Sequence, residues 1–226
     1  MSDTQKNLQA LYPFLHGKAK DADSENEALL ESIRQKVAQS VSEKQRFFAE
    51  NDQAFIAINQ AIASVYRNKK RMFSMGNGGS SCDASHFAVE FQHPVTAGRP
   101  ALPAVNLTAD TAMISAVAND VGVDYIFSRQ LEAFAASGDG LIGFSTSGNS
   151  KNLLEAFRMA KQLGLLTIGM TGGDGGAMLS SGLLDHCLVV KTDSIHRVQE
   201  VHVTSYHILW DLVHTLLADS RGLTSQ

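Results

Sequence analysis

Residues 71–90 read RMFSMGNGGSSCDASHFAVE. Residues 71–75, which include the apolar Met72, Phe73 and Met75, predict a short β-strand, and the glycines that follow predict a tight turn. Residues 80–91 then show the apolar spacing of an α-helix. A strand that passes through a glycine-rich turn into a helix is typical of α/β proteins. We therefore expect a sheet whose strands are connected through helices.

The rhythm of strand, loop and helix continues toward the C-terminus. Further strands are expected at residues 101–107, 140–145, 165–170 and 186–190, and helices at 125–136, 150–163 and 195–218. Because these strands are apolar without alternation, both faces of the sheet should be buried, as in parallel sheets. The sequence therefore predicts a three-layer sandwich, with helices on both sides of a parallel sheet.

The N-terminal region precedes any strand. Residues 1–24 are polar and are expected to form a flexible lead, and residues 25–226 are expected to form a single domain. Two helices, starting near Glu25 and near Gln53, are expected before the sheet. The apolar positions Leu29, Ile33, Val37 and Val41 have helical spacing. We expect these helices to pack against neighbouring copies and to form a symmetric tetramer.

The composition is that of an ordinary globular protein. The 226 residues are 44% hydrophobic and 19% charged, with a net charge of −4 and a pI near 6.0. No basic stripe stands out, so nucleic acid is a poor candidate partner. No signal peptide and no membrane-spanning run is recognisable, which favours a soluble cytoplasmic protein. Cys82 and Cys187 are interpreted as reduced thiols.

The segment STSGNS, residues 145–150, follows a strand and opens a helix. A helix N-terminus attracts anions, and Ser145, Thr146, Ser147 and Ser150 add hydroxyl donors. No lysine follows, so this is not a Walker loop, and the serine spacing differs from a hydrolase elbow. The segment favours a sugar monophosphate; the alternative is a serine-rich turn with a helix cap.

His86 and Glu90 are four residues apart and should share one face of a helix. Such a pair can supply two metal ligands or an acid and a base; the alternative is a hydrogen-bonded pair on a surface helix. The last helix carries His196, His202, His207 and His214, and these do not all point one way. His196 and His214 are interpreted as structural, as is His186.

Five motifs, in this order and at these spacings, resemble the phosphoheptose isomerases of the sugar isomerase (SIS) superfamily. They are GNGGSSCDASHFAVE (76–90), VANDVGVDYIFSRQ (117–130), STSGNS (145–150), TGGDGG (171–176) and RVQEVHVTSYH (197–207). The resemblance covers about residues 50–218. It implies a doubly wound α/β fold with a five-stranded parallel sheet, assembled into a homotetramer. It also implies conversion of sedoheptulose 7-phosphate to D-glycero-D-manno-heptose 7-phosphate.

The resemblance also assigns site residues. It implies zinc bound by His86, Glu90, Gln199 and His207, with Glu90 as the catalytic base and His207 as the acid. The implied substrate-binding residues are Asn77, Gly78, Gly79, Ser80, Glu90, Asn119, Asp120, Ser145, Thr146, Ser147, Ser150 and Gln199. The chain departs from the family pattern at Pro94, where family members have an arginine, and Arg99 is the nearest arginine. His196 stands where some members have an acidic residue.

A ketose–aldose isomerisation moves a proton between adjacent carbons through an enediol(ate). Glu90 suits the transfer between the carbons, His207 suits proton exchange at oxygen, and a metal could polarise the carbonyl. Gln199 offers only a neutral amide oxygen, so a weak or exchangeable metal site is expected. The alternative function is a non-catalytic SIS protein that binds sugar phosphates as a sensor or a partner-binding tetramer.

Overall fold

The computed structural model describes residues 22–222. The chain divides into two compact units, residues 1–41 and residues 42–226. Most of the lead expected over residues 1–24 lies outside the described residues; only residues 22–24 fall within them, and these are helical. The described part of the first unit is the start of helix α3 (Ala22–Arg67).

Helix α3 corrects the expectation of two N-terminal helices, because one helix of 46 residues spans both segments. No glycine or proline interrupts residues 22–67. At the expected break, the Asn51 side chain donates to the Phe47 carbonyl at 2.8 Å, an i−4 bond that stays within the helix. Asn51 and Asp52 read as turn formers in the sequence, but neither ends the helix here.

The sheet has five strands, all parallel: β1 (Met72–Gly76), β2 (Ala104–Asn106), β3 (Gly140–Ser145), β4 (Leu166–Gly172) and β5 (His186–Val190). Their spatial order is β2-β1-β3-β4-β5. The predicted doubly wound five-stranded sheet is therefore confirmed. Strand β2 is shorter than expected, because Pro103 falls within the predicted range and proline cannot donate to a ladder.

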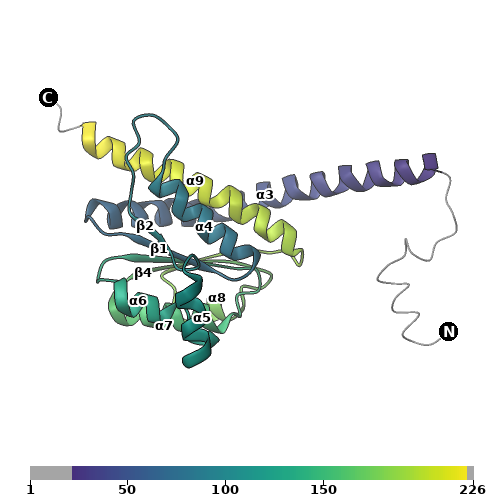
Figure 1. Cartoon of the computed structure of the whole chain (residues 1–226). Helices are drawn as coiled ribbons and strands as arrows, with labels where there is room; N and C mark the ends of the chain where they lie inside the picture. Colours follow the sequence, from purple (N-terminus) through teal and green to yellow (C-terminus); the bar gives the residue numbers. More distant parts are fainter. Residues whose placement is uncertain (1–21, 223–226) are drawn as a thin grey trace. The chain divides into compact units, whose positions relative to one another are not determined.

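Helices cover both faces of this sheet (Figure 1). One face carries α4 (Gly79–Gln92), α9 (Ile195–Gly222) and the part of α3 within the second unit. The other carries α5 (Thr111–Asp120), the short 3₁₀ helix η1 (Val123–Tyr125), α6 (Ser128–Phe134), α7 (Lys151–Leu163) and α8 (Gly176–Ser180). The helix expected at residues 125–136 is divided between η1 and α6. Helices α5 and α8 were not expected from the sequence.

Successive side chains of the central strands pack on opposite faces of the sheet, into two separate hydrophobic cores. Met72 and Ile142 pack into the core beneath α4 and α9, whereas Phe73, Met75 and Leu141 pack into the core beneath α6 and α7. All five side chains are fully buried. This explains why the strands read as unbroken apolar runs. Within residues 22–222, no helix is both long and apolar enough to cross a bilayer.

Candidate active site

The sheet order reverses between β1 and β3, which are neighbours although the chain leaves them toward opposite edges. In doubly wound sheets, ligands bind at the carboxyl ends of the strands at this switch point. An open pocket lies there. Its lining residues all follow β1 or come from β3 and the loop after it: Asn77, Ser80, Phe144, Ser145, Thr146, Ser147 and Ser150.

Two amide side chains join the loops on either side of this pocket. Asn77, after β1, and Asn152, in the first turn of α7, exchange two hydrogen bonds of 2.9 Å each. Asn152 is almost fully buried whereas Asn77 is exposed, so one side of the pair is shielded from water. The glycine turn (residues 76–79) and the loop of hydroxyl side chains (residues 145–150, the hydroxyl loop) are thereby held at a fixed separation. Sequence reasoning did not identify Asn152.

The hydroxyl loop is shaped by its own hydrogen bonds. Ser145 Oγ accepts from the Gly148 amide at 3.1 Å, and Ser147 Oγ accepts from the Asn149 amide at 3.3 Å. Ser150 is the N-cap of α7, but its hydroxyl makes no capping hydrogen bond. The N-terminus of α7 opens at this loop, where partial positive charge favours an anion.

The TGGDGG motif, residues 171–176, does not line this pocket, and the residues that follow it support the hydroxyl loop. The residues that follow it donate to that loop: Met178 N to Gly148 O and Ala177 N to Asn149 Oδ1, both at 2.9 Å. Gly148 has a φ of +66°, and a Cβ there would collide with the Gly175 carbonyl. A side chain at position 148 is therefore excluded by both backbone conformation and space.

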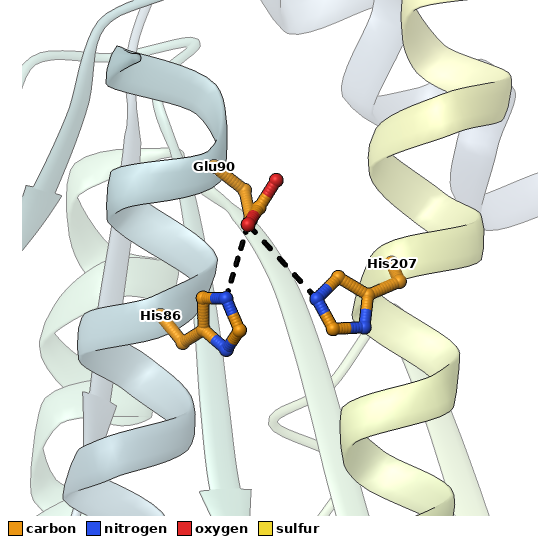
Figure 2. Close-up of side chains that lie close together, drawn as sticks. All are labelled: His86, Glu90 and His207. Carbon is orange, nitrogen blue, oxygen red and sulfur yellow. Dashed lines mark hydrogen bonds and ion pairs between the residues drawn. The ribbon is translucent and has the colours of Figure 1, made fainter. Parts of the chain in front are cut away.

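His86, Glu90 and His207 meet between two helices (Figure 2). His86 Nε2 lies 3.0 Å from Glu90 Oε1, and His207 Nε2 lies 3.9 Å from the same oxygen. One possible ligand atom from each residue lies within 4.8 Å of the other two. The side chains are 43%, 21% and 44% exposed respectively, so a small molecule or ion can reach them. This triad could hold a metal ion or transfer protons.

Helix α4 connects the triad to the pocket. Ser80, in its first turn, lines the pocket, and His86 follows six residues later, about 9 Å along the helix axis. Phe144 belongs to the pocket wall and also packs against Tyr206, which contacts His86. A ligand with its anionic end in the hydroxyl loop therefore has the triad within reach along one helix.

The remaining assigned residues lie around this arrangement. The Gln199 amide lies against Gly79, where a Cβ would collide with Gln199 Nε2. Gly78, Asn119 and Asp120 are exposed and do not line the pocket; Asn119 Nδ2 donates to Asp120 Oδ1 at 2.7 Å. The assignment of these residues as substrate or metal ligands stays a prediction.

The other histidines of α9 lie outside the triad. His202 is completely buried, and desolvation lowers its pKa to about 4, so it is neutral at pH 7. Its Nε2 lies 3.4 Å from the Thr171 carbonyl. His214 is buried between the rings of Phe91 and Trp210. His196 is exposed at the start of the helix.

Two further polar residues next to the triad were not identified from the sequence. Asp83 lies one turn before His86 on α4 and is only 5% exposed; burial raises its pKa to about 6, against an opposing effect of His86. The Tyr206 hydroxyl lies 2.8 Å from His86 Nδ1, and burial, followed by the charge of Asp83, raises its pKa. A signal existed, because position 83 falls on the apolar face of α4 that carries Phe87.

Arg99 does not replace the arginine that Pro94 displaces. Its guanidinium stacks on the Trp210 ring, 4.4 Å from the centroid, and pairs with Asp211. Both partners lie on α9, and the pocket lining does not include Arg99. Arg99 therefore fastens the loop after α4 to α9.

Known proteins resemble this chain in both sequence and fold. Residues 36–172 match the SIS domain family. A phosphoheptose isomerase from Sulfurimonas denitrificans is 40% identical over 184 residues, 80% of this chain and 93% of that protein. A phosphoheptose isomerase structure from Neisseria gonorrhoeae is 34% identical with a TM-score of 0.77, covering 83% of this chain and 99% of that one. Another from Francisella tularensis is 33% identical with a TM-score of 0.78, covering 82% and 98%.

The five-stranded parallel sheet and the matching domain family define a protein of the sugar isomerase (SIS) class. Within that class, the chain belongs to the phosphoheptose isomerase family and is an isomerase. The resemblance inferred from the five motifs is thereby confirmed.

Proposed function

We propose that this isomerase converts sedoheptulose 7-phosphate to D-glycero-D-manno-heptose 7-phosphate through an enediol(ate). One observation carries the proposal: His86 and Glu90 lie on α4, whose first turn lines the pocket, and His207 meets them from α9. The pocket suits the phosphate and the triad suits proton transfer at the other end of the sugar. Relatives that share about 40% of their residues with this chain are phosphoheptose isomerases.

In the proposed reaction, Glu90 removes a proton from one of two adjacent carbons and returns it to the other. His207 exchanges a proton with the oxygens, which become carbonyl and hydroxyl in turn. The hydroxyl loop holds the phosphate and so fixes which carbons lie beside Glu90. The two hydrogen bonds between Asn77 and Asn152 fix the distance between the two loops of the pocket.

We propose zinc as the cofactor, with His86, Glu90, Gln199 and His207 as the residues that would hold it. Two imidazoles and a carboxylate with ligand atoms within 4.8 Å are a donor set that zinc accepts. The neutral amide of Gln199 would be the weakest ligand. Bound zinc supplies Lewis-acid polarisation of the substrate carbonyl.

The alternative, a non-catalytic sugar-phosphate sensor, needs the pocket but has no use for an assembled triad. The contacts of Glu90 with both imidazoles therefore favour the enzyme. The direct test is to incubate the purified protein with ketose phosphates of different chain lengths and to identify the aldose products. We expect the seven-carbon ketose 7-phosphate to be converted. Binding of this sugar without any conversion would support the sensor instead.

Replacing Ser147 by alanine should weaken substrate binding without disabling the chemistry. Ser147 lines the pocket, and it is one of several hydroxyls there. We expect KM to rise by an amount equivalent to roughly 1–2 kcal/mol, with little change in kcat. Steady-state kinetics measure this, and Ser180→Ala in α8, outside the pocket, is the control. A loss confined to kcat would contradict the assignment of Ser147 to the phosphate.

We further propose that the protein is a homotetramer of the cytoplasm. Five apolar side chains of α3 are between 48% and 58% exposed: Leu29, Leu30, Ile33, Val37 and Val41. At about 100° per residue they fall within one stripe about 120° wide, as expected for a packed helix face. Light scattering should give the mass of a tetramer, and Ile33→Asp with Val37→Asp should lower it. A wild-type monomer at micromolar concentration would contradict the proposal.

A further inference from the structure

We infer that Tyr206 is a positioning residue for His86, and that its hydroxyl fixes the ring orientation in which His86 presents Nε2 to Glu90 and His207. This inference rests on the proposed metal-assisted function. Tyr206 contacts His86 and His207, and both of these residues would bind the metal in the proposed function.

The geometry separates the two nitrogens of the His86 ring. Nδ1 lies 2.8 Å from the Tyr206 hydroxyl, and Nε2 lies 3.0 Å from Glu90 Oε1. A metal-bound histidine uses one nitrogen as ligand, and the partner of the other nitrogen fixes the ring. With Nδ1 engaged by Tyr206, Nε2 is the nitrogen that faces the other two members of the triad.

A phenol hydroxyl suits this position in both states of the ring, because it can donate and accept. With Nε2–H donating to Glu90, Nδ1 carries the lone pair and accepts from Tyr206. When Nε2 serves as a metal ligand, the proton sits on Nδ1 and donates to the Tyr206 oxygen. A carboxylate could only accept and a lysine could only donate, so either would favour one state alone.

The surroundings hold Tyr206 rigidly. The residue is 2% exposed, and its ring packs edge-on against Phe144 with a centroid distance of 6.0 Å. It also contacts the rings of His86 and His207, at 5.2 and 4.9 Å. Its neighbour Asp83 is 5% exposed, and Asp83 Oδ2 makes no hydrogen bond within residues 22–222.

The test is Tyr206→Phe, which keeps the packed ring and removes only the hydroxyl. We expect the dissociation constant for zinc, measured by competition with a chromophoric chelator, to rise about 10–100-fold. In the metal-free protein, the ¹⁵N shift of His86 Nδ1 should change, because this nitrogen loses its hydrogen-bond partner. A residue that serves packing alone would change neither measurement.

Tyr66→Phe is the matched control, because the Tyr66 hydroxyl is also buried but has no hydrogen-bond partner within the described residues. It should leave zinc affinity and the His86 shifts unchanged. If wild type binds zinc and Tyr206→Phe binds it equally well, the inference is overturned and the proposed function stands. If wild type binds no zinc at saturation, the metal-assisted function fails and the inference fails with it.

Discussion

Glu90→Gln should lower the turnover of the seven-carbon ketose phosphate by about 10²–10⁴-fold, the usual effect of losing a general base. The amide has nearly the shape of the carboxylate and still offers an oxygen toward the two imidazoles, but it cannot accept a proton at neutral pH. Glu90 Oε1 is the atom that lies near both His86 and His207, so the change falls on the centre of the triad.

The measurement should be made at saturating zinc, with sugar phosphate binding followed separately by calorimetry. Binding should survive, because the phosphate is held by the hydroxyl loop. Glu155→Gln on α7, where Glu155 pairs with Arg158 at the surface, is the matched control and should retain full turnover. Turnover by Glu90→Gln at the wild-type rate would refute the role of Glu90 as the base.

His86→Ala should remove most of the bound zinc. The substitution deletes one of the three side chains that converge and leaves Glu90 with a single imidazole neighbour. Loss of a direct ligand should exceed the roughly 10–100-fold cost of losing a residue that only supports a ligand. Metal content after dialysis against limiting zinc, measured by atomic spectroscopy, reports the change, and we expect about one zinc per wild-type chain.

His196→Ala is the control on α9, because His196 is exposed at the start of that helix and lies outside the triad. It should keep the wild-type zinc content. Equal losses from His86→Ala and His196→Ala would mean that zinc binds histidines on the surface without selection. The assigned metal site would then be wrong.

The sequence predicted the sheet well because a buried parallel strand is a local signal. Met72, Phe73 and Met75 form an apolar run that ends in glycine, and the pairing of such strands follows from general rules of topology. The helix α3 was less predictable. Asn51 and Asp52 indicate a turn in isolation, but the helix continues through them, and Phe47 and Phe55 on either side pack into the same core.

The candidate site was predicted from local spacing only for the residues that lie close together in the sequence. The spacing of His86 and Glu90 places them on one helix face, whereas their meeting with His207 depends on how α4 and α9 pack, which no local pattern records. Tyr206 and Asn152 escaped notice because their role is a contact with residues far along the chain. In a sequence, such residues can be recognised as polar side chains at positions that the apolar periodicity assigns to the core.

The contact between His86 and Tyr206 spans 120 residues of chain. Joining points so distant closes a long loop, and the entropy lost in doing so must be recovered from the packed fold. The second, third, fourth and fifth strands all lie inside that loop. An ion bound between α4 and α9 would therefore act like a reversible crosslink across most of the domain. Its contribution to the melting temperature would depend on free metal concentration, so protein preparations should be compared only at matched metal loading.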